Sequence, residues 1–469
     1  MKHDDLLTVA MSDPSAMDVV DALRYRLNCD VEAVVATQDQ IDQQLDTHYR
    51  TAASAMEGLM SQLGEEAGMM EKVDALAVDQ AMEDDDAPII KLVTGVIVDA
   101  YRMGASDIHM EPMEKYYRVR YRVDGVLREM DSPPKFLQAN LTSRLKIMAR
   151  LDITEKRIPQ DGRIQLKYNG RPVDLRVSCL PTSFGESVVL RVLDRSVVNL
   201  ELDALGIGTD VLAQLRDLIR LPNGIILVTG PTGSGKTTTL YSALGEINNI
   251  EDKLLTAEDP VEYDIEGIIQ CPINDAVGMT FQKALRAFLR QDPDRILVGE
   301  IRDQDTAQIA IQAALTGHLV LSTLHTNDAA GAVTRFVDMG VQPFLLAATL
   351  LGVLGQRLVR TICPYCKTPY KPSNSLLNQL GINPQLIGSQ QFFPGARCDK
   401  CANTGYKGRK GIHELLNVTD PIKELITQNV PSIVLKQKAV ELGMTTLRED
   451  GIQNIFEGNT TIEEVLKYT

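Results

Sequence analysis

The chain has 469 residues, with 48 Lys and Arg against 63 Asp and Glu, which gives a formal net charge of −15. At about 100–200 residues per domain, this length predicts two to four domains. The hydrophobic content of 44% excludes a chain that is disordered throughout. The acid excess argues against a protein that coats DNA, because binding many phosphates needs a surplus of Lys and Arg on one face.

No apolar run reaches the roughly 18 residues that predict a transmembrane helix. The N-terminus lacks the basic-then-apolar pattern of a signal peptide. These two absences favour a cytoplasmic location.

Residues 1–50 have the pattern of a partial N-terminal α/β domain. Leu6–Met11 reads as a buried strand, Ser12-Asp13-Pro14 signals the start of a helix, and a second strand is expected around 31–36. The next segment, 51–87, differs in composition, since residues 57–86 hold ten acids and one lysine. This predicts a solvated acidic linker, and the alternative is a specific acidic docking site.

Residues 88–200 are expected to form an α+β middle domain. A helix is predicted over 89–103, and another follows near 141–151. Between them, Tyr117–Val123 alternates as a strand does, and Asp124-Gly125 gives a hairpin turn. Residues 101–200 carry 18 Lys and Arg against 12 acids, so this segment is basic. From 201 to 469, helices alternate with short apolar runs, which predicts a parallel sheet of βα units.

The most specific motif follows the apolar run 224–229. It has the pattern G-x-x-x-x-G-K-(S/T) between a predicted strand and a predicted helix, and this context disfavours a chance glycine-rich turn. Backbone amides would wrap the phosphates of ATP or GTP, Lys236 would reach the β- and γ-phosphates, and the Thr237 hydroxyl would ligate Mg²⁺. The predicted nucleotide-binding residues are Gly230, Pro231, Thr232, Gly233, Ser234, Gly235, Lys236, Thr237 and Thr238.

Carboxylates and histidines follow the neighbouring apolar runs. The run 254–257 leads into Glu258–Glu262, and the run 296–298 leads to Glu300. Because ligands bind at the carboxyl ends of strands in open α/β sheets, both groups are expected to face the phosphates. His318 and His325 bracket a strand of about 20 Å, so they cannot touch the same phosphate. His325, at the carboxyl end, is the expected γ-phosphate sensor; for His318, nucleotide contact and a structural role both stay open.

Two CxxC pairs, Cys363/Cys366 and Cys398/Cys401, are separated by 31 residues. Four thiolates form the tetrahedral set that suits structural Zn²⁺. A redox pair is the alternative, but neither CxxC lies in a thioredoxin-like βαβ context.

The runs 290–303, 316–318 and 322–327 resemble the secretion ATPase superfamily, the hexameric motors of type II secretion and type IV pili. Residues 105–112 and 157–163 match the middle domain of that family. Within it, 331–346 and 356–360 most resemble the type II secretion motors. The resemblance implies an α/β fold with a RecA-like P-loop ATPase domain in 201–469, a small zinc-binding module at 360–412, and a PAS-like α+β middle domain.

Residue roles follow from the same resemblance. Glu262 would be the general base for the attacking water, Glu300 the atypical Walker B glutamate, and His318 and His325 the His box. Four arginines match family positions that approach phosphates, the subunit interface or a basic helix, with a plain surface role as the alternative. They are Arg176, Arg191, Arg286 and Arg290.

The resemblance thus implies a cytoplasmic homo-hexamer that hydrolyses ATP with Mg²⁺ and carries Zn²⁺. It would lie at the inner membrane through secretion platform proteins, without a nucleic-acid partner, and power pseudopilus assembly and protein export. One alternative is a type IV pilus extension or DNA-uptake motor. The second is a zinc-ribbon nucleic-acid-binding switch NTPase, which would need a basic aromatic face near the cysteines.

Overall fold

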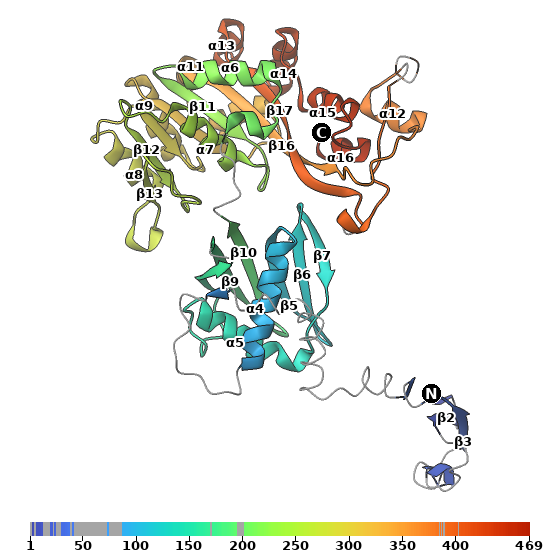
Figure 1. Cartoon of the computed structure of the whole chain (residues 1–469). Helices are drawn as coiled ribbons and strands as arrows, with labels where there is room; N and C mark the ends of the chain where they lie inside the picture. The colour runs from blue at the N-terminus through green and yellow to red at the C-terminus, as the bar shows by residue number, and fades with distance from the viewer. Residues whose placement is uncertain are drawn as a thin grey trace. The chain divides into compact units, whose positions relative to one another are not determined.

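A computed structural model describes residues 2–3, 6–12, 19–21, 23–24, 30–37, 40–41, 73–74, 87–168, 171–194, 201–383, 385, 387, 390–401 and 403–469. The chain divides into two compact units, residues 1–193 and 194–469 (Figure 1). The finer domain boundaries given above stay predictions. In the described part of the chain, no helix has both the length and the apolar character needed to cross a membrane.

A small sheet is formed by the first described strands, β1 (Lys2–His3), β2 (Leu6–Met11) and β3 (Asp30–Val35). β2 and β3 are parallel, with Leu6 opposite Asp30. The strand predicted at Leu6–Met11 is confirmed, and the second strand begins one residue earlier than predicted. The helix predicted between them lies largely outside the described residues.

A seven-stranded sheet follows in the order β4-β8-β9-β10-β5-β6-β7. The neighbouring pairs β4·β8, β8·β9, β10·β5, β5·β6 and β6·β7 are antiparallel. The strands are β4 (Val73–Asp74), β5 (Ala105–Pro112), β6 (Tyr117–Val123), β7 (Val126–Met130), β8 (Gln160–Tyr168), β9 (Arg171–Thr182) and β10 (Gly185–Asp194). The helical elements of this part are α4 (Ala87–Arg102), η3 (Lys135–Leu137) and α5 (Gln138–Met148).

Period-two alternation explains why this sheet has one apolar face. Tyr117, Val119, Tyr121 and Val123 of β6 are buried in a core that also holds residues of α4 and α5, and the arginines between them lie on the other face. Asp124 and Gly125 both have positive φ, 50° and 80°, in the predicted two-residue turn. The α+β class predicted for the middle domain is confirmed.

The second unit is built on a seven-stranded sheet of order β13-β12-β14-β15-β11-β16-β17, parallel throughout except for the last pair. Its strands are β11 (Gly224–Thr229), β12 (Leu254–Glu258), β13 (Ile269–Pro272), β14 (Arg295–Val298), β15 (Leu319–Leu324), β16 (Leu350–Ile362) and β17 (Tyr406–Asn417).

Helices lie on both faces of this sheet (Figure 1). The described helices are η4 (Leu202–Leu205), α6 (Thr209–Ile219), α7 (Lys236–Ile247), η5 (Asp275–Val277), α8 (Phe281–Phe288), α9 (Gln304–Leu315), α10 (Ala329–Asp338), α11 (Pro343–Thr349), α12 (Asn374–Leu380), η6 (Asp399–Cys401), α13 (Asp420–Thr427), α14 (Ser432–Glu441), α15 (Leu447–Phe456) and α16 (Ile462–Tyr468).

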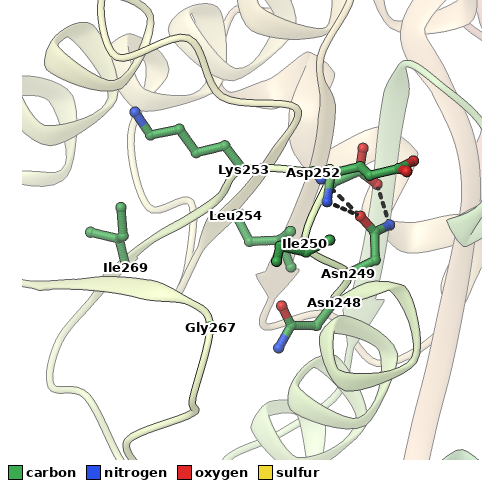
Figure 2. A pocket seen from close by; sticks show the side chains of 9 residues that line it. Asn248, Asn249, Ile250, Asp252, Lys253, Leu254, Gly267 and Ile269 are labelled. Carbon is green, nitrogen blue, oxygen red and sulfur yellow. Dashed lines mark hydrogen bonds between the residues drawn. The ribbon is translucent and has the colours of Figure 1, made fainter.

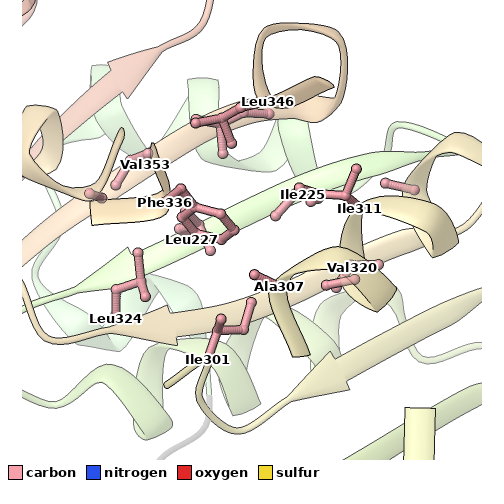
Figure 3. Packing of buried hydrophobic residues seen from close by; sticks show 14 of the residues in the cluster. Ile225, Leu227, Ile301, Ala307, Ile311, Val320, Leu324, Phe336, Leu346 and Val353 are labelled. Carbon is pink, nitrogen blue, oxygen red and sulfur yellow. The ribbon is translucent and has the colours of Figure 1, made fainter. Parts of the chain in front are cut away.

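Successive residues of β11 enter two different cores, which is why the strand is apolar throughout. Ile225 and Leu227 pack with Phe336 and other residues of one face (Figure 3). Ile226 and Val228 pack on the opposite face, against side chains of α6 and α7. A strand buried on both faces reads as a continuous apolar run, as parallel sheets require. The predicted α/β fold of this unit is confirmed.

The β16–β17 hairpin carries an insertion between its strands. β16 ends at Ile362, directly before Cys363, and β17 begins at Tyr406. Part of the inserted segment shares a small apolar core with the last two helices of the chain; its buried members are Leu377, Leu380, Phe392, Ile455, Ile462 and Val465. The four paired cysteines therefore lie in a module at the far end of two strands of the central sheet.

Candidate active site and metal centre

The glycine-rich loop joins the end of β11 to the start of α7. Gly230 has φ 155°, and a Cβ added there would lie 2.5 Å from the backbone oxygen of Gln356. Gly233 and Gly235 have φ of 78° and 89°, a backbone conformation that favours glycine. The amides of the first turn of α7 have no acceptor within the helix. The loop and the helix N-terminus therefore form an anion site.

Lys236 is held over this loop. Its Nζ donates to the backbone oxygens of Gly230 (2.8 Å) and Pro231 (3.0 Å), and burial lowers its pKa while the charge of Glu300 opposes that shift. The hydroxyl of Ser234 is buried and makes no hydrogen bond within the described chain. Thr237 is exposed at the helix start. The ammonium of Lys236 and the hydroxyls of Ser234 and Thr237 are therefore suited to bind a triphosphate and its metal ion.

Glu300 and His325 meet at the carboxyl edge of the same sheet. Glu300 comes shortly after β14, and its Oε2 lies 3.5 Å from Nε2 of His325, which follows β15 directly. Its other oxygen lies 2.5 Å from the guanidinium of Arg302. Burial, reinforced by the charge of Lys236, lowers the pKa of His325 although Glu300 acts to raise it. The imidazole is therefore neutral at pH 7 and can both donate and accept a hydrogen bond.

Hydroxyl groups hold these strand ends in place. The Oγ1 atoms of Thr229 and Thr326 lie 2.6 Å apart, which joins β11 to the segment after β15. Thr323 donates to the backbone oxygen of Gly299 at 2.7 Å, which joins β15 to the segment that carries Glu300. Lys236, Glu300 and His325 thus converge because the ends of three strands are tied together.

Glu258 and Glu262 have different surroundings. The side chain of Glu258 is 3% exposed, and its carboxylate accepts hydrogen bonds from Tyr241, Thr256 and Gln270. This carboxylate is engaged by the protein itself and does not face the phosphates as expected. Glu262 is half-buried, and its backbone amide donates to the Tyr241 hydroxyl at 3.2 Å. The role of Glu262 as the general base stays a prediction.

His318 lies at the opposite edge of the sheet from this site. Its backbone oxygen accepts from the amide of Gly224, the first residue of β11, and its Nδ1 lies 2.9 Å from the backbone oxygen of Ala313. A strand of six residues, about 20 Å long, separates it from His325. The structure therefore places His318 outside the site that the P-loop forms within this unit.

Arg286 and Arg290 are exposed on α8 and just after it. Arg290 lies next to Gln291, whose backbone oxygen accepts from the ammonium of Lys253, the residue that precedes β12. The end of α8 is thus near the amino edge of the sheet, and the structure does not bring Arg290 to the P-loop.

A cavity of about 490 Å³ opens at this amino edge (Figure 2). The turn beside it is organised by Asn249, whose Oδ1 accepts from the amides of Glu251 and Asp252 at 2.7 and 2.8 Å. Asn248, Leu254 and Ile269 also line the cavity. Because β12 begins at Leu254, this cavity lies at the end of the strand opposite the nucleotide site.

Arg176 and Arg191 belong to the sheet of the first unit. Their sequence neighbours Leu175, Val177 and Leu190 are buried in the core, so both arginines lie on the face opposite α4 and α5. Arg176 is opposite Arg163 in the β8·β9 pair, and Nε of Arg191 lies 2.9 Å from Asp107. Their approach to a phosphate or to a subunit interface stays a prediction.

The structure brings Gln356 and Arg357 to the P-loop, and no role was predicted for either residue from the sequence. Thr229 of β11 is opposite Gly355 of β16, so the next residues of β16 follow the loop. Gln356 accepts from the hydroxyl of Thr239 at 2.8 Å, and Arg357, 6% exposed, donates to the backbone oxygen of Asn327. The motif 356–360 was visible in the sequence, but the pairing of β16 with β11, which gives these residues a role, was not.

The four paired cysteines form one cluster. Their sulfur atoms all lie within 4.8 Å of one another, and three of the separations are 3.7, 3.9 and 4.0 Å. Four thiolates around Zn²⁺ at about 2.3 Å would be about 3.8 Å apart, so Cys363, Cys366, Cys398 and Cys401 fit a closed tetrahedral site. Cys179 and Cys271 lie outside this cluster.

A glycine-rich phosphate loop, with Lys236, Glu300 and His325 at the carboxyl edge of a parallel sheet, defines a RecA-like P-loop ATPase. The family model described as type II/IV secretion system protein matches residues 82–467, and a second model, the MshEN domain, matches residues 1–55. The chain belongs to the type II/IV secretion system protein family.

Individual relatives agree with this assignment. Type II secretion system protein E of Aeromonas hydrophila is 48% identical over 95% of this chain and 89% of its own length. The type IV pilus assembly ATPase PilB of Myxococcus xanthus (strain DK1622) is 46% identical over 99% of this chain and 82% of its own length. Among solved structures, the pilus retraction motor PilT with bound ADP is similar with a TM-score of 0.54 and 27% identity, covering 80% of this chain and 96% of that one.

Proposed function

We propose that this chain is the ATPase of a type II secretion system, and that ATP hydrolysis at the carboxyl edge of the second sheet powers pseudopilus assembly and protein export. The observation that carries the chemistry is the convergence of Lys236, Glu300 and His325 beside the P-loop. The secretion role is supported by the similarity to type II secretion system protein E over most of both chains.

Each residue of the site has a distinct task in this proposal. Lys236 and the loop amides would bind the β- and γ-phosphates, and the Thr237 hydroxyl would hold Mg²⁺. Mg²⁺ would neutralise charge on the phosphates. Glu262 would accept the proton of the attacking water, Glu300 would help to hold Mg²⁺ through its waters, and neutral His325 would sense the γ-phosphate.

The cysteine cluster has a structural task. The four thiolates would bind Zn²⁺ with no position left for a substrate, so the metal stabilises the module inserted between β16 and β17.

The proposed assembly is a homo-hexamer in the cytoplasm, attached to the inner membrane through platform proteins of the secretion system. Arg176, Arg191, Arg286 and Arg290 are the proposed cationic contacts to phosphates or neighbouring subunits. A cation supplied across a subunit boundary stabilises transition-state charge only when the domains close.

A second candidate within the family is a type IV pilus extension or DNA-uptake motor. The similarity to PilB, which covers 99% of this chain, favours it. The nucleic-acid-binding alternative has no such support, and salt-sensitive DNA binding at physiological ionic strength would be the observation that revives it.

The experiment that separates the candidates is a deletion strain scored for secretion, twitching and DNA uptake together. The proposed function predicts lost secretion with intact twitching and transformation. Lost twitching or transformation with intact secretion would assign the chain to a pilus or DNA-uptake system instead. Complementation with the intact gene is the control, and complementation with Lys236→Ala should not restore secretion.

A further inference from the structure

Tyr241 connects the P-loop helix to the segment that carries Glu262. It lies on α7, five residues after Lys236, and its side chain is fully buried. Its hydroxyl donates to Oε2 of Glu258, and it accepts a hydrogen bond from the backbone amide of Glu262 at 3.2 Å. One oxygen atom of α7 thus binds both Glu258 and Glu262, which follow Tyr241 by 17 and 21 residues.

Glu258 is itself fixed, so the hydroxyl has a rigid acceptor. The other carboxylate oxygen accepts from Thr256 (2.5 Å) and from Gln270 (3.1 Å). Gln270 also donates to the backbone oxygen of Tyr263 at 3.0 Å and accepts from the amide of Ile265 at 2.7 Å. Tyr241 on one side and Gln270 on the other therefore hold the segment 259–265.

The direction of these hydrogen bonds follows from the chemistry. The backbone amide of Glu262 can only donate, so the Tyr241 oxygen accepts from it, and the Tyr241 proton is left for Glu258. Burial, followed by the hydrogen bond to Glu258, raises the pKa of Tyr241, so the phenol keeps its proton at neutral pH.

We propose that Tyr241 is a positioning residue for the hydrolysis step: its hydroxyl fixes the distance between the P-loop helix and Glu262. This inference rests on the proposed role of Glu262 as the base. The phosphates would be bound to α7 through Lys236 and Thr237, while the proposed base lies on a separate loop. A displacement of about 1 Å between a catalytic group and the reacting atoms can cost on the order of 100-fold in rate. The buried Tyr241 hydroxyl is the contact through which α7 restrains that displacement.

The first test is Tyr241→Phe, which removes only the hydroxyl. The ring keeps its edge-to-face contact with Tyr263, at 6.0 Å between centroids, and its place in the core. The kcat for ATP is expected to fall about 10-fold or more, while KM and ATP affinity change less than about 2-fold. Tyr117→Phe is the matched control, because Tyr117 is an equally buried tyrosine of the first unit; its kcat should stay at the wild-type value.

A double-mutant cycle separates this inference from the proposed function. If Tyr241 acts through Glu262, then Tyr241→Phe causes no further loss of kcat in a Glu262→Gln background. An equal loss in both backgrounds, or a rise in KM that accounts for the whole effect, would show a general structural role and overturn the inference. A Glu262→Gln enzyme with full turnover would overturn the proposed base instead, whatever Tyr241→Phe does.

A second variant keeps the test decisive if Tyr241→Phe does not fold. Glu258→Gln weakens the acceptor of the Tyr241 hydroxyl while leaving its ring in place. It should lower kcat at unchanged KM in the wild-type background and have no further effect beside Glu262→Gln. Wild-type kcat in the folded Glu258→Gln protein would contradict the inference.

Discussion

The side-chain hydroxyls of Thr229 and Thr326 lie 2.6 Å apart, and the amide of Thr326 also donates to Oγ1 of Thr229 at 3.1 Å. Thr229 is the last residue before the P-loop, and Thr326 follows His325. The pair therefore sets the position of His325 relative to Lys236 without touching either side chain, and the nucleotide site is assembled from strand ends rather than from one contiguous motif.

Lys236→Ala should abolish ATP hydrolysis. The ammonium is the cation that the loop holds over the phosphates, and loss of such a group costs at least about 100-fold in rate. Turnover is measured by phosphate release. Lys253→Ala is the matched control, since Lys253 lies before β12 at the opposite edge of the sheet, and it should hydrolyse ATP at the wild-type rate. Retained turnover in Lys236→Ala would contradict the nucleotide assignment.

Glu262→Ala should bind ATP and hydrolyse it far more slowly. The substitution removes the proposed base but leaves the phosphate loop and its lysine intact, so affinity, measured with a fluorescent ATP analogue, stays within a few-fold of wild type. Glu266→Ala changes an exposed glutamate of the same loop and should have normal turnover. Normal turnover in Glu262→Ala would transfer the role of base to another group.

Chelation or Cys363→Ser should release zinc and loosen the inserted module. One of four thiolates is lost, and the module depends on the closed site. Elemental analysis measures the metal, and limited proteolysis between β16 and β17 measures the loosening, while ATP binding persists. Cys271→Ser, outside the cluster, should keep one zinc per chain. A fully folded wild-type protein without metal would refute the site.

His413 should make the second unit less stable in mild acid. It lies on β17, it is fully buried, and neither ring nitrogen has a hydrogen-bond partner among the described residues. Burial lowers its pKa to about 4. Since the unfolded chain binds this proton near pH 6.5 and the folded chain only near pH 4, stability is complete above pH 6.5 and falls as the pH drops between these values. The loss is about 2 kcal/mol at pH 5.

The measurement is the free energy of unfolding in urea at pH 7 and pH 5 for wild type and for His413→Leu. The difference between the two pH values should shrink by about 2 kcal/mol in the variant, because leucine does not titrate. An unchanged difference would show that other groups cause the acid sensitivity. His318→Leu, which alters a partly exposed histidine at the sheet edge, is the control.

The strands that are buried on both faces were predictable, because a short, continuous apolar run indicates such a strand. Gly224–Thr229 and Leu319–Leu324 are wholly apolar runs apart from their hydroxyl residues, and both strands have the predicted bounds. The side-chain environment of Glu258 was not predictable. It depends on Tyr241 and Gln270, which reach it only when α7 and β13 pack beside β12.

The edge at which a residue lies was predictable only from the direction of the chain. His325 follows a strand and His318 precedes the same strand, and this order places them at opposite edges. The place of Arg357 beside the P-loop was not predictable in this way. It depends on the parallel pairing of β16 with β11, two strands separated by more than a hundred residues of chain. Long-range pairing of this kind is not encoded in a local pattern.

β16 runs without interruption from Leu350 to Ile362, so Gln356 and Arg357 beside the P-loop share one strand with the residue that precedes Cys363. The six residue steps from Arg357 to Cys363 extend about 20 Å. The antiparallel partner β17 stiffens this stretch as far as Tyr406. The strand β16, paired with β17, is therefore the direct covalent connection between the residues beside the P-loop and the cysteine module.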